Sequence, residues 1–227
     1  MDRTSSRPAR RSALRRLAVA GLLGAGGAAG LLRAALAAGH AGTQTGIRSI
    51  KGTVTVNGQP ATVGQEIKPG QTVVTGPDSE AIYVIGKDAF LQHENSEFGR
   101  AEGTGVVVLR YITGKVLSVF GKGRKRLETP TATIGIRGTA CFINAGTDNT
   151  YFCLCYGTAV ITPKGNPKAR RWLRTKHHES PMNVSSGKTG PAYRKMEVVD
   201  HTDDELVMLE ELVGRVPPFV GKGYSAY

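Results

Sequence analysis

The chain has 227 residues, of which 40% are hydrophobic and 21% are charged, and its mean hydropathy is −0.20. This composition is typical of a globular domain and excludes both a protein with several membrane spans and a wholly disordered chain. The net charge is +12, but residues 1–37 contain seven arginines and one acid, so half of the excess lies in that segment. Three cysteines are too few for a disulfide scaffold.

Residues 1–37 have the order of a secretory signal peptide. An arginine-rich stretch precedes the apolar run Leu17 to Leu32, and small residues follow at Ala35-Leu36-Ala37. The run from Arg10 to Arg15 resembles a twin-arginine export motif, with a general secretory signal as the alternative. The apolar run is shorter than the roughly 20 residues that span a membrane, so we expect cleavage, and a single-pass inner-membrane anchor is the alternative. We therefore expect a periplasmic protein with no nucleic-acid partner, and with membrane contact only if this segment is uncleaved.

Residues 38–163 form the predicted folded domain, in which short apolar or alternating runs are separated by turn residues. Asn57-Gly58 predicts a hairpin turn because both positions favour positive φ. Lys68-Pro69-Gly70-Gln71 predicts a second turn, and Thr113-Gly114-Lys115 predicts a further hairpin. Strands recurring at intervals of about 8–12 residues indicate an all-β fold, a β-sandwich or solenoid of short antiparallel strands. The predicted strands are Thr53–Val56, Thr72–Thr75, Ala81–Ile85, Val106–Ile112, Val116–Phe120, Thr131–Ile136, Ala140–Ile143, Tyr151–Tyr156 and Ala159–Ile161.

The most distinctive run is Thr129-Pro130-Thr131-Ala132-Thr133-Ile134-Gly135-Ile136-Arg137-Gly138-Thr139. Pro130 cannot donate to a central ladder and so ends a strand, while Gly138 permits a sharp bend. Arg137 carries a rigid fork of donors. We interpret the run as a corner of the β fold in which Arg137 satisfies buried acceptors. The alternative is that Thr129, Pro130, Arg137, Gly138 and Thr139 contact a partner.

Together with the spacing upstream, this run resembles the FecR domain, a periplasmic β-rich module. The resemblance extends from about Gly52 to about Val160 and includes Lys68-Pro69-Gly70, Gly114-Lys115-Val116 and Gly157. Gly86-Lys87-Asp88-Ala89 departs from it, where the family has Asp-Gly-Ser. Full-length regulators of this family resemble three-part devices: a cytoplasmic segment that controls a sigma factor, a membrane span and the periplasmic domain. Only sixteen residues precede the apolar run here, and we expect these to be too few to fold into such a cytoplasmic segment. The resemblance therefore implies an exported binding or sensing module.

The three cysteines lie in two neighbouring predicted strands. Cys153 and Cys155 are two residues apart and therefore face the same side. If the two strands pair in one register, Cys141 lies directly opposite Cys153 or Cys155. If the register shifts by one residue, Cys141 faces the other side of the sheet. One interpretation is an inert or disulfide-bonded core, and another is a thiol redox or metal site to which His177 or His178 adds a ligand. Because Cys-x-Cys is not a usual structural zinc spacing, we assign no metal and no other cofactor at this stage.

Residues 164–227 are expected to form an extension that contains a basic loop and a helix. The loop carries a group of bases around Trp172, and a second basic run precedes the distinctive motif. Such patches on an exported protein favour an anionic polymer as partner, while a solvated surface is the alternative. The two groups of bases are Lys164, Lys168, Arg170, Arg171, Arg174 and Lys176, and Lys122, Arg124, Lys125 and Arg126.

A helix is predicted over about residues 203–213. Thr202-Asp203-Asp204-Glu205 is a capping box, and Leu206, Leu209 and Val213 then form an apolar stripe. A helix of this length is marginal alone, so we expect its stripe to dock on the β domain.

The sequence contains no Gly-x-Ser-x-Gly, P-loop or His-Glu-x-x-His motif, and we therefore expect no enzymatic activity. The function favoured is a periplasmic binding or sensing module that contacts an envelope protein or an anionic polymer, with a place in signalling implied by the resemblance. The alternative is a periplasmic thiol redox or metal-binding protein that uses Cys141, Cys153 and Cys155.

Overall fold

The computed structural model describes residues 44–101, 105–225 and 227, so the predicted signal peptide lies outside the described residues. The fold is mostly β, with 49% strand and one short C-terminal helix, as predicted. In the described part of the chain, no helix is long and apolar enough to cross a membrane. The elements are β1 (Gly46–Lys51), β2 (Val54–Val56), β3 (Gln59–Pro60), β4 (Thr72–Thr75), β5 (Glu80–Ile85), β6 (Asp88–Gln92), β7 (Ser96–Arg100), β8 (Val107–Val119), β9 (Arg124–Glu128), β10 (Ala132–Arg137), β11 (Ala140–Ala145), β12 (Asn149–Pro163), η1 (Pro167–Ala169), β13 (Arg171–Thr175), β14 (Met182–Ser185), β15 (Tyr193–Lys195) and α2 (Asp203–Leu212).

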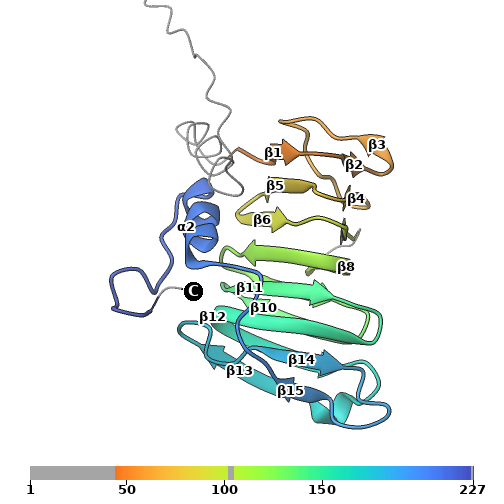
Figure 1. The fold of residues 1–227 in the computed structure, drawn as a ribbon, viewed down its shortest axis with the longest axis vertical. Helices are drawn as coiled ribbons and strands as arrows, with labels where there is room; N and C mark the ends of the chain where they lie inside the picture. The colour runs from red at the N-terminus through yellow and green to blue at the C-terminus, as the bar shows by residue number, and fades with distance from the viewer. Residues whose placement is uncertain (1–43, 102–104, 226) are drawn as a thin grey trace, which may run out of the picture.

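The strands form two facing sheets whose strands follow one another along the long axis of the molecule (Figure 1). Sheet A has the order β1-β5-β6-β8-β11-β12-β14-β15. Sheet B has the order β3-β2-β4-β7-β8-β9-β10-β12-β13. Because β8 and β12 belong to both sheets, β8, β11, β12, β10 and β9 close into a ring of five strands. We expected antiparallel strands throughout, but the β8–β9 pair is parallel.

The two long strands pass from one sheet to the other at glycines. Gly114 in β8 has φ +77° and Gly157 in β12 has φ +104°. A Cβ atom at Gly114 would lie closer than 3.0 Å to Ser96, and one at Gly157 would lie closer than 3.0 Å to Thr139. Both positions therefore require a residue without a side chain.

Two sequence predictions fail at these bends. The hairpin expected at Thr113-Gly114-Lys115 does not form, and the strands expected at Tyr151–Tyr156 and Ala159–Ile161 are one strand. A positive-φ glycine resembles a turn in the sequence, but here the chain continues in the neighbouring sheet. By contrast, the Asn57-Gly58 hairpin is confirmed, with φ values of 50° and 76° between β2 and β3.

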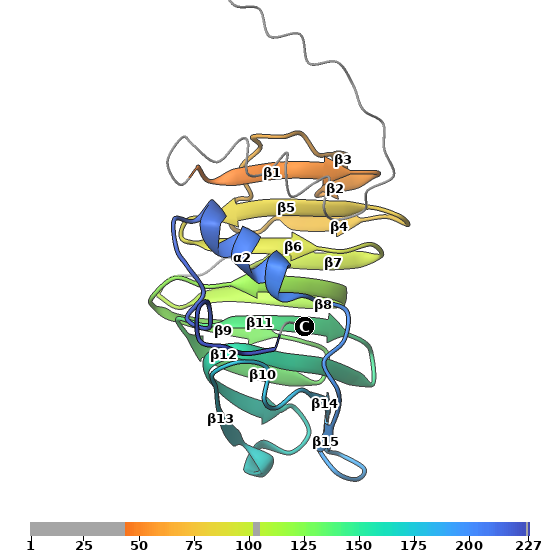
Figure 2. The same ribbon diagram turned by 60° about the vertical axis from the view of Figure 1, so that its left-hand side comes forward.

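The described residues form two apolar cores. The first lies between the sheets and includes Tyr83, Phe90 and Phe98, whose rings contact one another. The second lies on the outer face of sheet A, where Leu206 and Leu209 of α2 cover it. Figure 2 shows α2 crossing this face over β5, β6 and β8. The middle of sheet A is therefore buried on both faces, which explains why all of β6 is buried rather than alternate residues.

Helix α2 begins with the predicted capping box. The Thr202 hydroxyl accepts from the Glu205 amide at 3.3 Å, and the Glu205 carboxylate accepts from the Thr202 amide at 2.8 Å. Gly214, with φ +69°, follows the helix. Both the helix and its docking on the β domain are confirmed.

The segment after Pro163 is not the loop that its basic composition suggested. It forms η1 and then β13, which pairs with β12 from Gly157 to Ile161, while β14 and β15 extend sheet A. In β13, Trp172 and Arg174 face outward and alternate with Leu173 and Thr175, which face inward, so the segment has the period of a strand.

We predict that Gly157→Ala lowers the free energy of unfolding by about 2–4 kcal/mol, because it combines a strained φ with overlap against Thr139. The matched control is Gly135→Ala, since a Cβ at Gly135 meets nothing within 4 Å, and this change is expected to be neutral or stabilising by up to about 1 kcal/mol. Urea unfolding measures both. Equal effects of the two substitutions would contradict the assignment of Gly157 as a crossing point.

Candidate functional site

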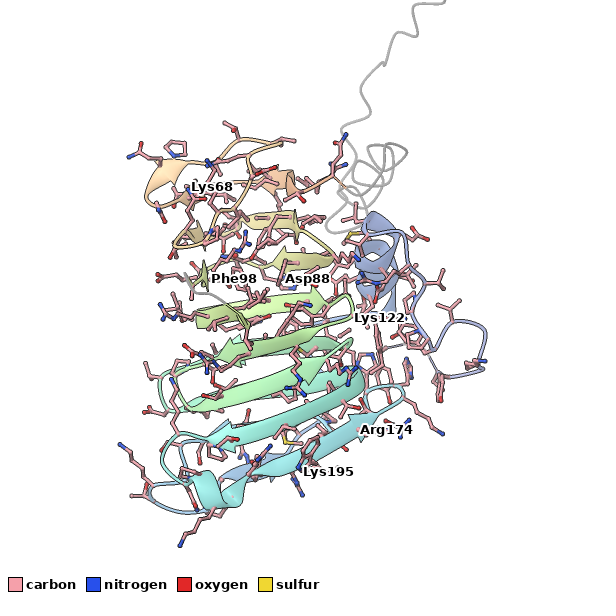
Figure 3. All side chains as sticks on the ribbon, turned by 180° about the vertical axis from the view of Figure 1, so that it is seen from behind. Lys68, Asp88, Phe98, Lys122, Arg174 and Lys195 are labelled. Carbon is pink, nitrogen blue, oxygen red and sulfur yellow. The ribbon has the colours of Figure 1, made fainter. Side chains whose placement is uncertain are left out.

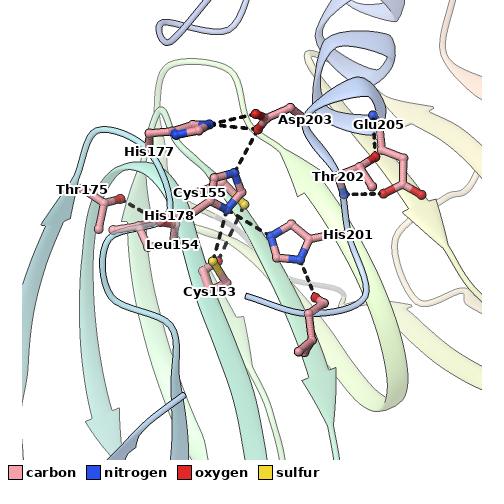
Figure 4. A network of polar contacts seen from close by, with 11 residues as sticks. Cys153, Leu154, Cys155, Thr175, His177, His178, His201, Thr202, Asp203 and Glu205 are labelled. Carbon is pink, nitrogen blue, oxygen red and sulfur yellow. Dashed lines mark hydrogen bonds and ion pairs between the residues drawn. The ribbon is translucent and has the colours of Figure 1, made fainter. Parts of the chain in front are cut away.

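Four side chains with sulfur or imidazole ligand atoms converge on the outer face of sheet A beside α2 (Figure 4). Cys153 and Cys155 come from β12, His178 from the segment after β13, and His201 directly precedes the Thr202 cap. One ligand atom of each lies within 4.8 Å of the other three, and all four residues are buried. We call these four residues the Cys/His cluster.

Close polar contacts join the members of the cluster. The Cys153 sulfur lies 3.4 Å from His178 Nδ1, which lies 3.2 Å from His201 Nε2. The His178 amide donates to the Cys155 carbonyl at 2.9 Å, although His178 has a φ of +54°. The His201 ring stacks on Phe142, with ring centroids 4.6 Å apart.

The surroundings favour a thiolate at Cys153. A hydrogen bond from the Cys155 thiol holds the pKa of Cys153 well below its usual range. Burial acts in the opposite direction, while the contacts with His178 and His201 lower the pKa further. Burial and the neighbouring Cys153 raise the pKa of Cys155. Burial disfavours the charged form of His201, but the interaction with Cys153 outweighs it and raises the pKa of His201. A thiolate is the form in which cysteine acts as a nucleophile or binds metal.

A second polar layer surrounds the cluster. Asp203, the first residue of α2, accepts from His178 Nε2 at 3.2 Å and lies 2.9 Å from His177 Nε2. The His177 ring in turn contacts the rings of Tyr224 and Tyr227 in the C-terminal tail. The tail therefore covers the carboxylate–imidazole contacts.

The structure unites only part of the sequence-predicted cysteine site. Cys141 pairs in register with Leu154, not with a cysteine, and therefore points into the core between the sheets. It is buried and free, as are Cys153 and Cys155, so the disulfide considered for Cys141 is not formed. Burial raises its pKa well above the usual range, which leaves it an inert thiol.

Sequence reasoning missed His201 and the role of Asp203. Asp203 was assigned only to the capping box, and His201 lies 46 residues from Cys155 in the chain. No spacing rule connects them. The one signal available was a lone histidine directly before a helix cap that was expected to dock on the cysteine-bearing strands.

The residues of the distinctive run fall in two places. Thr129 and Pro130 form the turn between β9 and β10, where the Thr129 hydroxyl accepts from the Thr150 hydroxyl at 2.9 Å. The Thr139 hydroxyl donates to the Tyr156 carbonyl beside the crossing at Gly157. Both threonines are buried and structural.

Arg137 corrects the interpretation from the sequence. It is exposed at the end of β10 and makes no side-chain hydrogen bond or ion pair with the described residues, so it does not satisfy buried acceptors. It pairs in register with Arg124, which is also exposed. The inward-facing base of this region is instead Lys125, whose ammonium lies 3.1 Å from the Asp88 carboxylate.

The two basic runs of the sequence meet on the outer face of sheet B. Arg126, Gly135, Val160 and Trp172 lie in register across β9, β10, β12 and β13. Beside this row, Arg124 pairs with Arg137, and Arg174 pairs with Thr158. We call this surface the basic face, and define it by the exposed residues Arg124, Arg126, Arg137, Arg174 and Trp172.

A pocket of 680 Å³ adjoins the basic face, between the sandwich and the C-terminal segment. Its lining includes Lys122, Gly138, Arg174, Lys176 and Lys222. In Figure 3, Lys122 and Arg174 lie along the same edge of the molecule. The pocket therefore continues the positive surface.

A buried carboxylate anchors α2 beside this pocket. Glu210 is 4% exposed, accepts a hydrogen bond from the Tyr156 hydroxyl and lies 2.5 Å from Arg215 Nε. Arg215 also donates to the Lys87 carbonyl at 2.7 Å. Burial, together with the Glu210 carboxylate, raises the pKa of Tyr156, so the phenol stays protonated and remains a donor.

No family model matches the chain, and no curated protein does. Among solved structures, two crystal structures of a "putative anti-sigma factor" from Parabacteroides distasonis are similar, each with a TM-score of 0.46 and 10% identity. The match covers 56% of this chain and 59% of the other, so it spans less than two thirds of that protein. The likeness concerns the fold alone, and the FecR resemblance stays a prediction.

We predict that Glu210→Ala destabilises the protein by about 2–3 kcal/mol, because it leaves Tyr156 and the partly exposed Arg215 without their buried partner. Glu211→Ala is the matched control, since its exposed side chain lies one residue away at the end of the same helix, and it should change stability by less than about 0.5 kcal/mol. Thermal unfolding reports both. A similar loss for the two variants would show that helix composition, not this anchor, matters.

Proposed function

We propose that this chain is an exported, non-enzymatic module of the FecR-like kind that binds an anionic envelope polysaccharide on the basic face. The observation that carries the proposal is the convergence of Arg124, Arg137 and Arg174 beside the exposed Trp172. These residues belong to β9, β10 and β13. Arg124 and Arg174 come from the two basic runs, and Arg137 comes from the distinctive run between them.

The charge of this face is largely uncompensated. Glu128 lies 3.3 Å from Arg110 and 3.4 Å from Arg126, and so partly neutralises Arg126, one residue of the basic face. No acidic partner contacts Arg124, Arg137 or Arg174 among the described residues. Guanidinium groups at such positions suit carboxylates or phosphates, to which they donate two parallel hydrogen bonds.

The shape of the face suits an extended polymer. Trp172 is 69% exposed and lies in register with Val160 and Gly135. Gly135 leaves open space above the strand, since a Cβ there would meet no atom within 4 Å. A flat surface with an aromatic ring and fixed cations offers stacking to a sugar ring and pairing to its acidic groups. These features favour an acidic polysaccharide over a compact protein.

We predict that the triple variant Arg124→Gln/Arg137→Gln/Arg174→Gln binds polygalacturonate at least about tenfold more weakly than the unaltered chain, measured by calorimetry at low salt, since three guanidinium–carboxylate contacts are lost. Raising the ionic strength should weaken binding of the unaltered chain in the same direction. Gly135→Glu should have a similar effect without unfolding the protein, because it places a carboxylate in open space.

The matched control removes the same charge elsewhere. Lys51→Gln/Lys68→Gln/Lys188→Gln alters three exposed bases outside the basic face and should retain most of the affinity. Equal losses in the two triple variants, or equal binding to neutral dextran, would contradict the proposal. Shortening of the polymer during incubation would contradict the non-enzymatic assignment.

Export has its own test. We predict that the protein recovered from the periplasmic fraction begins near Ala38, because the small residues before it mark the cleavage point. N-terminal sequencing of fractionated cells measures this. An intact start in the membrane fraction would instead support the anchor, and an intact protein in the cytosol would contradict export.

A further inference from the structure

We propose that the Cys/His cluster binds one zinc ion through the sulfurs of Cys153 and Cys155, His178 Nδ1 and His201 Nε2. The inference is independent of the proposed polysaccharide binding, since the cluster lies on the outer face of sheet A and the basic face belongs to sheet B. Two thiolates and two imidazoles are a donor set that zinc takes in tetrahedral geometry.

The distances between the ligand atoms fit such a site. With bonds of about 2.0 Å to nitrogen and 2.3 Å to sulfur, a tetrahedron has edges of about 3.3 Å between two nitrogens and about 3.5 Å between nitrogen and sulfur. His178 Nδ1 lies 3.2 Å from His201 Nε2 and 3.4 Å from the Cys153 sulfur. Since all four ligand atoms lie within 4.8 Å of one another, the widest pair exceeds a sulfur–sulfur edge by at most about 1 Å.

The outer contacts of both histidines orient their ligand nitrogens. His201 Nδ1 lies 2.7 Å from the Val199 carbonyl, which accepts only, so we assign the proton to Nδ1 and a lone pair to Nε2. His178 Nε2 lies 3.2 Å from the Asp203 carboxylate, which likewise assigns the lone pair to Nδ1. Two ring nitrogens with facing lone pairs, 3.2 Å apart, repel each other unless a cation or a proton lies between them. A zinc ion removes that repulsion.

The second layer is of the kind that metal sites use. The Asp203 carboxylate on the far nitrogen of His178 forms a carboxylate–histidine pair, which fixes the orientation of the ring. Two thiolates balance the charge of Zn²⁺, so the buried site is neutral when filled. Binding replaces the thiol protons, and zinc affinity therefore falls at low pH.

The ligands come from three separate parts of the chain: β12, the segment after β13, and the residue before α2. A bound ion therefore ties the C-terminal segment to the sandwich. Its free energy of binding adds to the stability of the folded chain as far as the unfolded chain binds zinc more weakly.

The test uses the full chain, reduced and freed of metal with a chelator, then titrated with zinc chloride alone. We expect about one zinc per chain by elemental analysis, a higher unfolding temperature, and loss of two reactive thiols in a count under denaturant-free conditions. Cobalt(II) in place of zinc should give the visible absorption of a tetrahedral sulfur–nitrogen site. Cys153→Ser and His201→Gln should each abolish these signals.

The matched control is Cys141→Ser, since Cys141 is also a buried free thiol but lies on the inner face of the sheet. It should retain the full zinc content and the cobalt spectrum. Asp203→Asn should weaken zinc binding by about 10–100-fold through the lost second-layer contact, whereas the exposed neighbour Asp204→Asn should not.

Three results would overturn the proposal. One is a folded, reduced chain that binds no zinc and gives no tetrahedral cobalt spectrum, which would leave a proton shared between Cys153, His178 and His201. Another is unchanged zinc content in folded His201→Gln. The third is loss of zinc in Cys141→Ser as complete as in Cys153→Ser. The first of these results is obtained on the unaltered chain, so it tests the proposal even if a variant fails to fold.

Discussion

The passage of β12 from sheet A to sheet B at Gly157 is the constraint on which the rest of the structure depends. Before the crossing, alternate side chains of β12 point outward from sheet A and place Cys153 and Cys155 beneath the C-terminal segment. After it, Val160 lies on the outer face of sheet B between Gly135 and Trp172. The strand β12 therefore supplies two members of the Cys/His cluster and, beyond Gly157, lies between the strands β10 and β13 that carry part of the basic face.

The same device recurs along the chain. Gly52 lies between β1 in sheet A and β2 in sheet B, has φ +69°, and packs against Ser79, as Gly114 packs against Ser96 and Gly157 against Thr139. At each crossing the hydroxyl bonds to the backbone: Ser79 accepts from the Thr53 amide at 2.8 Å and Ser96 accepts from the Lys115 amide at 2.8 Å. A glycine permits the bend, and a small hydroxyl side chain occupies the space that the glycine leaves.

The C-terminal segment completes the domain rather than extending it. Helix α2 closes the second core, Glu210 anchors it through Tyr156 and Arg215, and His201 and Asp203 at its start join β12 in the Cys/His cluster. Its aromatic tail covers His177. A zinc ion in the cluster would act at the point where this segment meets the sandwich, and so would couple metal content to its docking.

Local chemistry in the sequence determined the β class, the Asn57-Gly58 hairpin and the capped helix, because each depends on neighbouring residues and on the period of the side chains. The sequence also pointed to Cys153, Cys155 and His178 as possible ligands. Only the tertiary structure decided that Cys141 faces away, that His201 completes the cluster, and that Arg124, Arg137 and Arg174 share one face. Those outcomes depend on strand register and on the direction that the chain takes after each glycine bend. They could not be read from the sequence, because contacts between distant segments leave no periodic signal in it.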